Sequence, residues 1–444
     1  MLEDTIAAIA TGRNEAAISI VRLSGPHVFD VMKKIFKKDL TKVPTHTIHY
    51  GYIRDGEEIV DEVLVNVYKG KHTFTGENMV EINCHGGIYI TNRVLETCIK
   101  YGARMANHGE FSERAFLNGR IDLAQAESIA DLISSKTKVS SALALKGIQG
   151  RVSLLIKDLK EDLIKIITQI EVNIDYPEYD AVEELTAKTL LPLSENFINK
   201  IDKILENARS GKIIREGIST AIIGKPNVGK SSLLNALLEE DKAIVTDIAG
   251  TTRDIVEGSI RLGGIVLNII DTAGIRKTDD VVEKIGVEKS KSVLNNADLV
   301  LLVLDGSQPL TKEDQELLEM TQKMNRIVIL NKEDQGVVVD LDGVHISAKD
   351  QKIEQLEDKI KEMFNLGQLE QNQEVMISNI RHITLLEQAR LSVIKAIEAM
   401  KQDIPTDLIV LDLYDAWKDL KDILGEEAKE DLLDELFSRF CIGK

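Results

Sequence analysis

Residues 224–231 read Gly-Lys-Pro-Asn-Val-Gly-Lys-Ser and match G-x-x-x-x-G-K-[ST], the pattern of a phosphate-binding loop. An apolar run at 219–223 precedes them, as expected for a loop at the end of a strand. Glycines allow backbone N–H groups to curl around phosphate oxygens, and the N-terminus of the following helix favours an anion. The pattern assigns Lys230 to the β- and γ-phosphates of a nucleotide and the Ser231 hydroxyl to Mg²⁺. A lone match of this pattern also arises by chance, so its weight depends on other motifs.

The second motif, Asp-Thr-Ala-Gly at 271–274, ends the apolar run 266–270. This position would place the Asp271 carboxylate near the metal and the Gly274 N–H near the γ-phosphate. Ras-like enzymes place a glutamine just after this turn to orient the attacking water. Here Ile275 occupies that position and cannot hydrogen-bond, so another group must position water. The polar candidates in the following segment are Arg276, Asp279, Asp280 and Glu283, each of which is also explained as a solvated charge.

The third motif, Asn-Lys-Glu-Asp at 331–334, ends the apolar run 327–330 and can read the base. The Asp334 carboxylate can accept from N1–H and the 2-amino group of guanine; adenine lacks both donors, so a buried unpaired carboxylate would penalise ATP. Ser-Ala-Lys at 347–349 stands where a loop would support the base. Together the four motifs predict a GTP site. Outside the switch loop, its nucleotide contacts are expected to be Asn227, Val228, Gly229, Lys230, Ser231, Ser232, Asp271, Thr272, Ala273, Gly274, Asn331, Lys332, Asp334, Ser347, Ala348 and Lys349.

Residues 246–254, Thr-Asp-Ile-Ala-Gly-Thr-Thr-Arg-Asp, are expected to form the first switch loop. They offer hydroxyl and carbonyl oxygens, hard ligands suited to Mg²⁺ and to an alkali cation. Asn227 in the phosphate loop can supply one more oxygen, although an asparagine after a proline is also a common turn former. The switch residues predicted to contact nucleotide or cation are Thr246, Asp247, Ile248, Ala249, Gly250, Thr251 and Thr252.

The elements that must position these motifs change character along the chain. Residues 1–120 mix short β-like runs with two helical stretches and predict a small α+β domain. From Asp122 onward the apolar spacing is that of long amphipathic helices, and near residue 218 continuous apolar runs favour a parallel sheet covered on both faces. Helices return after about residue 370. Helices on both sides of an α/β block predict one helical domain interrupted by an insertion. The expected helices are 26–37, 87–101, 154–174, 191–209, 379–401, 408–422 and 427–439.

Composition narrows the classes of protein. The 444 residues suffice for two or three domains, and the net charge of −18 argues against wrapping nucleic acid by bulk electrostatics, although a local RNA contact stays open. The longest apolar strand candidate, 299–304, is far short of the ~20 residues of a membrane span. Three cysteines without metal-ligand spacing, and an amino terminus lacking a secretory pattern, predict a cytoplasmic protein with no membrane association.

Several phrases outside the GTPase motifs resemble the TrmE-type family of tRNA-modification GTPases, and the resemblance covers essentially the whole chain. The phrases from Gly109 to Asn118 and at the cysteine-containing terminus are absent from generic GTPases. The resembling segments are 74–77 (Phe-Thr-Gly-Glu), 84–87 (Cys-His-Gly-Gly), 109–119, 122–127 and 440–444 (Phe-Cys-Ile-Gly-Lys).

The resemblance implies a multidomain fold: an α+β amino-terminal folate-binding and dimerisation domain, a discontinuous α-helical domain and an inserted Ras-like α/β P-loop GTPase domain. The amino-terminal domain would span residues 1–118 and the GTPase domain residues 217–366. The helical domain would consist of two parts, 119–216 and 367–444. It also implies a homodimer whose GTPase domains meet during hydrolysis.

The resemblance also assigns cations and a water-positioning residue. K⁺ would take the role of an arginine finger, Thr252 would join Ser231 on Mg²⁺, and Glu283 would position water. The implied K⁺ ligands are Asn227, Thr246, Ile248 and Thr251.

The family's folate site, for a 5-formyl- or methylene-tetrahydrofolate, carries over to Arg22, Glu81 and Arg120, with Lys444 nearby. Relatives commonly have a lysine at the position of Arg120. The arginine keeps the positive charge but changes the geometry of the contact. Cys441 fits a lipidation motif poorly. From its spacing alone, this cysteine could equally be a functional residue or a buried apolar one. The resemblance implies a catalytic role for Cys441 in modification. His85 amid glycines invites a metal or acid–base interpretation, against that of a loop or core contact.

The function implied is installation of an aminomethyl or carboxymethylaminomethyl group at C5 of wobble uridine, position 34, of certain tRNAs. The partner would be an MnmG (GidA)-type FAD protein, in a heterotetramer or larger complex, because no flavin motif is present in this chain. The alternatives are a regulatory or ribosome-assembly GTPase without modification chemistry, and a simple folate-binding enzyme, which leaves the GTP site unexplained.

Overall fold

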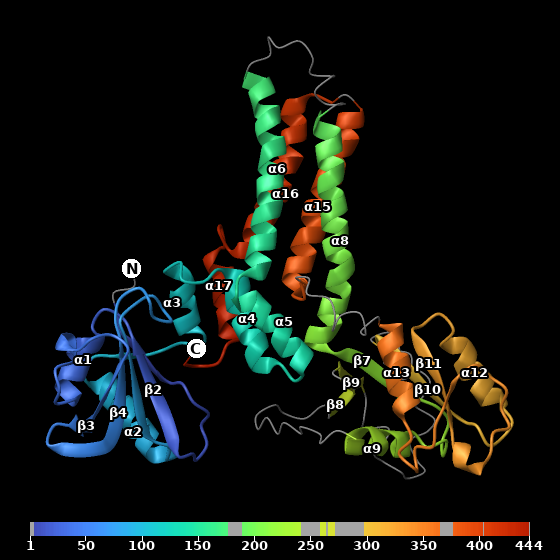
Figure 1. Cartoon of the computed structure of the whole chain (residues 1–444), viewed down its shortest axis with the longest axis horizontal. Coiled ribbons are helices and arrows are strands. Elements are labelled where there is room, and N and C mark those ends of the chain that lie inside the picture. The colour runs from blue at the N-terminus through green and yellow to red at the C-terminus, as the bar shows by residue number, and fades with distance from the viewer. Residues whose placement is uncertain are drawn as a thin grey trace. The chain divides into compact units, whose positions relative to one another are not determined.

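The computed structural model describes residues 4–175, 189–240, 258–262, 265–270, 297–364, 376–402 and 404–443. Two compact units result: Met1–Ala130 with Gly147–Lys160 and Lys418–Lys444, and Asp131–Lys146 with Glu161–Trp417. Both units contain sheet and helix (Figure 1). The multidomain α and β fold class is confirmed, while the domain boundaries proposed from sequence stay a prediction.

The first unit contains a six-stranded sheet in the order β3-β4-β5-β2-β1-β6. Its strands pair antiparallel except β1 with β6, which are parallel. Its elements are β1 Ile6–Ile9, β2 Ile18–Ser24, α1 Val28–Ile35, a 3₁₀ turn Leu40–Lys42, β3 Thr47–Asp55, β4 Glu58–Tyr68, β5 Met79–His85, α2 Ile88–Lys100, β6 Arg104–Met105, α3 Glu110–Leu117 and α17 Glu430–Ser438.

One face of this sheet is buried under α1 and α2. Apolar residues alternate along the strands, so Val63, Val65 and Val67 of β4 point into this core. The intervening residue Leu64 and its cross-strand partner Tyr50 are exposed on the opposite face.

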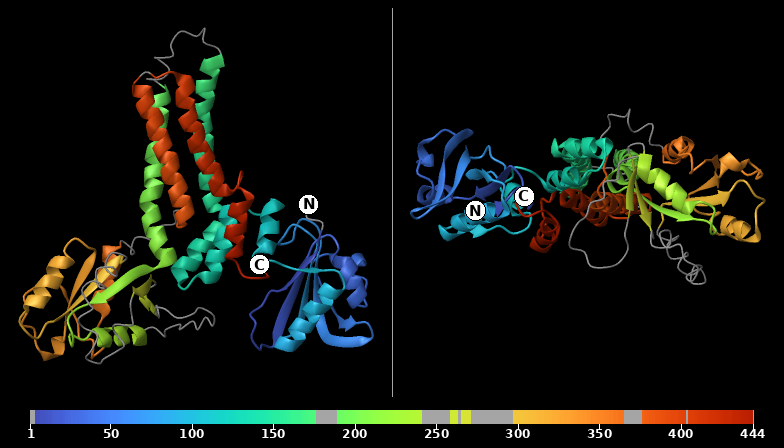
Figure 2. Two further views of the ribbon diagram at one scale, coloured as in Figure 1. Left: turned by 180° about the vertical axis from the view of Figure 1, so that it is seen from behind. Right: turned by 90° about the horizontal axis from the view of Figure 1, so that it is seen from below.

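Long helices form the middle of the chain and its last part. They are α4 Leu123–Ser134, α5 Lys138–Ile148, α6 Arg151–Asp175, α8 Leu191–Glu216, α15 Ile380–Lys401 and α16 Thr406–Leu424. Figures 1 and 2 show α8 and α15 running side by side. Among the described residues, no helix is both long and apolar enough to span a membrane.

The expected end of the fourth helix near residue 209 is wrong, because α8 continues to Glu216. Gly211 lies within it, against the backbone that leads into α15: a Cβ there would lie 2.6 Å from the Ile377 carbonyl oxygen. The two residues after the expected end therefore include a glycine that the close packing of this helix requires.

The second sheet has the order β12-β11-β10-β7-β9-β8, parallel except for the antiparallel edge strand β8. Numbered in chain order, the strands lie 2-3-1-4-5-6, with the first strand at the point where the order reverses. Its elements are β7 Ile218–Ile223, α9 Lys230–Glu240, β8 Gly258–Leu262, β9 Ile265–Ile270, β10 Leu299–Asp305, α12 Lys312–Met320, β11 Arg326–Asn331, a 3₁₀ turn Glu333–Gln335, β12 Val344–His345 and α13 Glu354–Met363.

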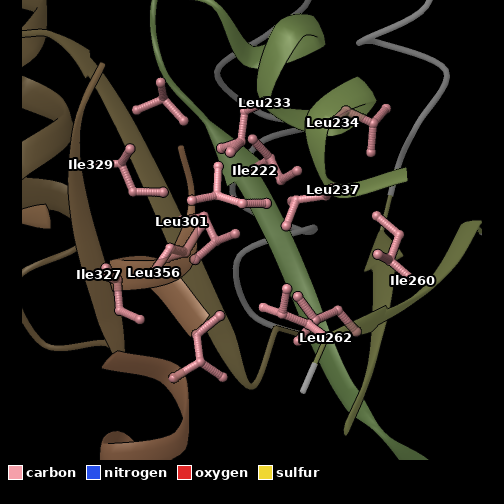
Figure 3. Close-up of a cluster of buried hydrophobic side chains, with 14 of the residues drawn as sticks. Ile222, Leu233, Leu234, Leu237, Ile260, Leu262, Leu301, Ile327, Ile329 and Leu356 are labelled. Carbon is pink, nitrogen blue, oxygen red and sulfur yellow. The ribbon is translucent and has the colours of Figure 1, made fainter. Parts of the chain in front are cut away.

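Helices cover both faces of this sheet, as the sequence predicts. Leu233 and Leu237 of α9 and Leu356 of α13 pack in one core with the strands (Figure 3). Leu317 and Leu318 of α12 pack against the cluster on the opposite face. Every residue of β10 is buried, which explains its continuous apolar run.

Candidate functional site

The phosphate-binding motif forms the loop between β7 and α9, at the carboxyl end of a central strand. The loop has positive φ angles at Gly224 (156°), Asn227 (62°) and Gly229 (98°). A Cβ on Gly229 would lie 2.2 Å from Asn331 Nδ2, and one on Gly224 would lie 2.3 Å from the Val303 carbonyl oxygen. Glycine is therefore required at both positions, and the left-handed geometry of Asn227 suits a turn-forming asparagine.

Asn331 joins three of the four motifs. Its Nδ2 donates to the Val228 carbonyl in the phosphate loop (2.8 Å), and its Oδ1 accepts from the Ala348 N–H (3.0 Å). The side chain is buried at the end of β11. One amide thus sets the spacing between the phosphate loop and the loop at 347–349.

The base-reading motif is positioned by two polar contacts. Lys332 has a left-handed φ of 68°, and its Nζ donates to Asp305 Oδ2 at 2.7 Å. Burial alone would raise the pKa of Asp305, but hydrogen bonds from Lys332 and Ser307 outweigh it and hold that pKa below its usual value. The Ser347 hydroxyl lies 3.2 Å from Oδ1 of Asp334, the carboxylate expected to accept from guanine, and 2.9 Å from Asp350 Oδ2, so the two carboxylates compete for its single proton.

Two lysines of the phosphate loop have different surroundings. The Lys230 ammonium donates to the carbonyls of Gly224 (2.7 Å) and Lys225 (2.8 Å), so it lies over the loop that precedes it. Lys225 pairs with Asp314 Oδ2 at 2.8 Å, where Thr311 begins α12 with a capping box. Burial alone would raise the pKa of Asp314, but the hydrogen bonds of Lys225 and Thr311 lower it.

Part of the predicted nucleotide site lies outside the described residues. These positions are Thr246, Asp247, Ile248, Ala249, Gly250, Thr251, Thr252, Asp271, Thr272, Ala273, Gly274 and Glu283. Ser231 and Ser232 follow Lys230 in the first turn of α9, and Lys349 follows the Ala348 contact. Among the described residues, no cluster of three or more His, Cys, Asp or Glu side chains could hold a metal.

A second polar site is centred on Arg22 in β2. Its Nε and Nη2 donate to Glu81 Oε1 in β5 at 3.0 and 2.9 Å, and Tyr68 donates to Glu81 Oε2 at 3.2 Å. Its Nη1 donates to the Gly443 carbonyl oxygen at 3.1 Å. The structure therefore brings two predicted folate residues together and joins them to the end of the chain.

Aromatic rings also hold this guanidinium. The Phe74 and Phe111 rings lie 5.6 and 5.7 Å from Arg22 Cζ, within the range of cation–π attraction. Both phenylalanines belong to the sequence phrases that carry the family resemblance.

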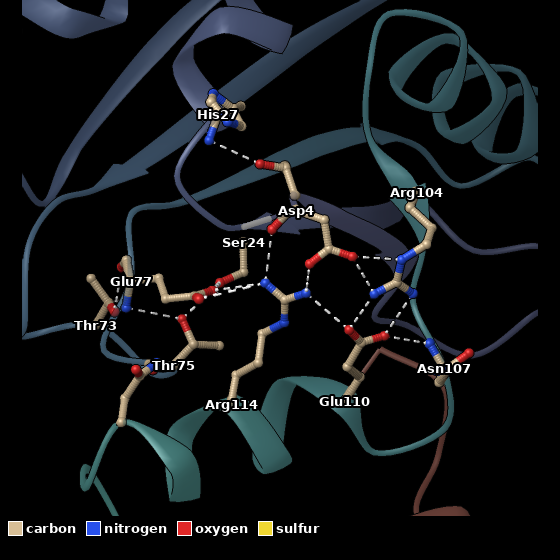
Figure 4. A network of polar contacts seen from close by, with 12 residues as sticks. Asp4, Ser24, His27, Thr73, Thr75, Glu77, Arg104, Asn107, Glu110 and Arg114 are labelled. Carbon is tan, nitrogen blue, oxygen red and sulfur yellow. Dashed lines mark hydrogen bonds and ion pairs between the residues drawn. The ribbon is translucent and has the colours of Figure 1, made fainter. Parts of the chain in front are cut away.

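A buried ion network fixes the loop that carries Phe74 (Figure 4). Arg114 of α3 is fully buried and pairs with Asp4 (2.7 Å), Glu77 (3.3 Å) and Glu110 (2.9 Å). Burial alone would raise the pKa of Glu110, but the bonds from Arg104, the Asn107 backbone and Arg114 outweigh it and lower that pKa. This network ties the first strand, α3 and the 73–77 loop together.

The terminal segment carrying Cys441 is anchored on both sides. The Phe440 carbonyl lies 3.0 Å from His108 Nδ1, and Ile442 forms a β-bridge with His108. Gly443 has a φ of 93°, and a Cβ there would lie 2.4 Å from the Ile9 carbonyl oxygen. The segment is thus docked by a glycine that admits no side chain, and by Arg22.

The three cysteines differ in access. Cys84 and Cys98 are buried, whereas Cys441 is exposed. Burial raises the pKa of the Cys84 thiol, and raises that of Cys98 to about 12. Among these thiols, Cys441 is therefore the accessible one, which disfavours its interpretation as a buried apolar residue.

The remaining predicted residues are less connected. The Arg120 side chain is exposed and makes no hydrogen bond or ion pair within the described part of the chain, and Lys444 lies outside that part. His85 Nδ1 lies 2.7 Å from Asp61 Oδ1, and Asp61 raises the pKa of this exposed imidazole. The sequence analysis did not single out Tyr68, His108 or Gly443, because no motif or spacing marks these residues.

Family models match nearly the whole chain: "GTP-binding protein TrmE N-terminus" over residues 5–120 and "MnmE helical domain" over residues 123–441. A protein of Enterococcus faecalis named tRNA modification GTPase MnmE is 49% identical over 457 residues, covering 99% of this chain and 98% of its own length. One of the same name from Levilactobacillus brevis is 51% identical, with the same coverage. A solved FeoB G-domain from Methanococcus jannaschii, 26% identical, covers 33% of this chain and 98% of its own, with a TM-score of 0.24, too low to support a conclusion.

Proposed function

The chain belongs to the MnmE family of tRNA-modification GTPases, and from that premise we propose that it modifies C5 of uridine 34 in certain tRNAs. It is a GTP hydrolase that acts in tRNA modification. The proposal adds the reaction: addition of an aminomethyl or carboxymethylaminomethyl group whose methylene carbon comes from a 5-formyl- or methylene-tetrahydrofolate.

The contact between Arg22 and Gly443 is the observation that carries this proposal. It holds the segment with the exposed Cys441 beside Arg22 and Glu81, the residues assigned to the one-carbon donor. The ring system of a folate presents paired donors to a carboxylate, and its glutamate tail suits cations such as Arg22, Arg120 and Lys444. A GTPase switch without modification chemistry would have no use for a thiol held at this place.

The nucleotide would be held by groups whose positions the fold supports. The loop with glycines at 224 and 229 suits phosphates, and Asp334, within hydrogen-bond distance of Ser347, suits guanine. Ser231 and Thr252 would hold Mg²⁺, which offsets phosphate charge. Asn227, Thr246, Ile248 and Thr251 would hold K⁺, with Glu283 positioning water.

We also propose a homodimer through the uncovered face of the first sheet. Ile48, Tyr50 and Leu64 are exposed there to 65%, 59% and 46%, an apolar surface on neighbouring strands. A second copy would cover it and allow paired GTPase domains to open and close with hydrolysis. An MnmG-type FAD protein would supply the flavin, in a cytoplasmic complex.

The test is mass spectrometry of tRNA nucleosides from cells lacking this chain, rescued with the wild type or with Cys441→Ser. We expect C5-modified uridine to be lost in the deletion and restored only by the wild type. A Cys84→Ser rescue is the control, because that thiol is buried and should be dispensable. Unchanged nucleosides in the deletion would instead favour the assembly-switch alternative.

The cation proposal has its own measurement. GTP hydrolysis by the purified chain should be faster in potassium chloride than in sodium chloride at equal ionic strength. Equal rates in the two salts would remove K⁺ from the proposed site without affecting the modification proposal.

A further inference from the structure

A group of lysines at one end of the β3–β4 hairpin stands out in a chain whose net charge is −18. We call Lys37, Lys38, Lys42, Lys69 and Lys71 the basic surface. Residues 33–42 alone contain five lysines and a single carboxylate, that of Asp39. Four of the five lysines of the basic surface are exposed, and Lys69 is half-buried.

Side-chain contacts place Lys38 and Lys69, and the chain places Lys37, Lys42 and Lys71 within four residues of one of them. Lys38 Nζ lies 2.9 Å from His49 Nδ1 in β3. Lys69, just after β4, donates to the Thr41 carbonyl at 2.8 Å, and its Nζ lies 5.2 Å from the centre of the Phe29 ring in α1. The segment 37–43 and the end of β4 therefore form one continuous surface.

At the opposite end of the same hairpin, the positive charges are paired with a carboxylate. There Asp55 pairs with Lys100 at 2.6 Å and with Arg93 at 3.8 Å, so each cation faces a carboxylate. Such pairing compensates charge within the molecule.

On the basic surface, the lysines find no comparable carboxylates. Lys69 and Lys38 contact carbonyls and an imidazole, and within the described residues Lys37 and Lys71 make no ion pair. Lys42 reaches Asp39 Oδ2 only at 3.5 Å, and the other oxygen, Oδ1, accepts from the backbone N–H and the hydroxyl of Thr41. Positive charge is left over at this end of the hairpin.

The imidazole within the group responds to that charge. Burial, followed by the charges of Lys38 and Lys69, lowers the pKa of His49 and keeps it neutral near pH 7. Like charges held together raise the free energy of the folded state, and an external polyanion relieves the repulsion.

We propose that the basic surface binds the sugar–phosphate backbone of the tRNA on which this chain acts. The inference rests on the family's role in tRNA modification. Its argument from position also uses the Arg22 site proposed above, but its binding test does not depend on the one-carbon donor. Because the chain as a whole repels RNA, contact with tRNA needs a local surface of this kind.

The position of the surface favours RNA over an acidic protein. His46, beside the lysines, packs edge-on against Tyr68 with ring centres 5.5 Å apart. The Tyr68 hydroxyl donates to Glu81, the partner of Arg22. A backbone bound on the basic surface would therefore pass one side chain away from the Arg22–Glu81 pair, where a nucleotide must arrive for modification.

The test compares two triple variants of the full chain that lose the same charge. K37Q/K38Q/K71Q removes exposed lysines of the basic surface, and K157Q/K203Q/K395Q removes three exposed lysines of α6, α8 and α15. The measurement is the affinity for an unmodified tRNA transcript as a function of salt concentration. Guanine-nucleotide affinity and the urea unfolding midpoint of the first unit, which neither variant should change, report that both units are folded.

We expect the surface variant to bind tRNA at least ~10-fold more weakly at ~0.1 M salt, with a slope of log K against log salt that is shallower by about two. The control variant should change the affinity less than ~2-fold. Equal weakening by both variants would mean bulk charge, and no weakening by either would mean another site; each outcome overturns the proposal.

An acidic protein partner is the remaining alternative. It would be indicated if the surface variant kept its tRNA affinity and lost binding to poly-glutamate, and this result would also overturn the proposal. Failure of the folate chemistry would leave these binding results unchanged, so the two proposals fail separately.

Discussion

The nucleotide loop and the Arg22 site both join segments far apart in the chain, but by different means. In the second sheet, parallel strands end at one edge, so loops that follow them meet there, and the single amide of Asn331 sets their spacing. In the first sheet, the site lies where antiparallel strands meet the end of the chain. Charge pairs assemble it, including the bond from Arg22 to a carbonyl 421 positions away.

The difference concerns what each site depends on. The strand order already places the nucleotide loops next to one another, so the Asn331 contact only adjusts the distance between them. The Arg22 site has no such guarantee, because buried ion pairs and a tight glycine contact determine where its segments lie. Substitutions should therefore cost structure at the Arg22 site and mainly ligand affinity at the nucleotide site.

The largest effect should come from Arg114→Met. The substitution leaves Glu77 without its buried cation and Glu110 with Arg104 alone, and losing one member of a buried pair costs about 3–5 kcal/mol. The opening free energy of β1 and β2 amides, measured by hydrogen exchange, should fall by that amount. Arg439→Met, which breaks an exposed pair with Glu435, should cost about 1 kcal/mol or less. Equal effects would refute the dependence on buried charge.

Asn331→Ala should act on ligand affinity rather than structure. It removes hydrogen bonds to Val228 and Ala348, together worth about 2–3 kcal/mol, or roughly 30- to 150-fold in nucleotide affinity. Binding of a fluorescent guanine nucleotide measures it, and Asn325→Ala, at an exposed 3.4 Å contact, is the control. A large loss of strand protection with intact affinity would contradict the comparison.

Gly443→Ala separates steric contact from backbone strain. The new Cβ would lie 2.4 Å from the Ile9 carbonyl, so the terminal segment should undock, at a cost of about 1–3 kcal/mol. The readout is faster hydrogen exchange of residues 441–443. Gly119→Ala has a similar positive φ (67°) with nothing within 4 Å of the added Cβ, and should leave the terminus protected. Equal exchange in both variants would show that contact with Ile9 is unimportant.

The smallest effect should be a pH dependence of the first unit. Asp61 raises the pKa of His85, so this pair stabilises the folded state fully below about pH 6.5 and progressively less as pH rises through the folded pKa. Unfolding midpoints in urea should therefore decline over that window in the wild type, and less steeply in Asp61→Asn. Parallel pH profiles of the two proteins would show that the His85–Asp61 pair does not cause the pH dependence of stability.

The sequence by itself determined the multidomain fold class and the family, and it predicts the nucleotide site and the order of α+β, helical and α/β segments. These features depend on patterns among residues close together in the chain. They are a glycine-rich loop after an apolar strand, motifs at the ends of strands, and the periodic spacing of apolar residues. Even the expected helix end at residue 209 failed for a non-local reason, since the Gly211 contact with the backbone before α15 is invisible in the sequence.

Only the tertiary structure decided how the amino-terminal site is built. Nothing in the spacing of Arg22, Tyr68 and Gly443 indicates that they meet, because ion pairs and carbonyl contacts between distant segments leave no period in the chain. The same holds for the uncompensated lysines of the basic surface. Whether a surface charge has a partner depends on which strands and turns fold beside it, and that is a property of the packed chain.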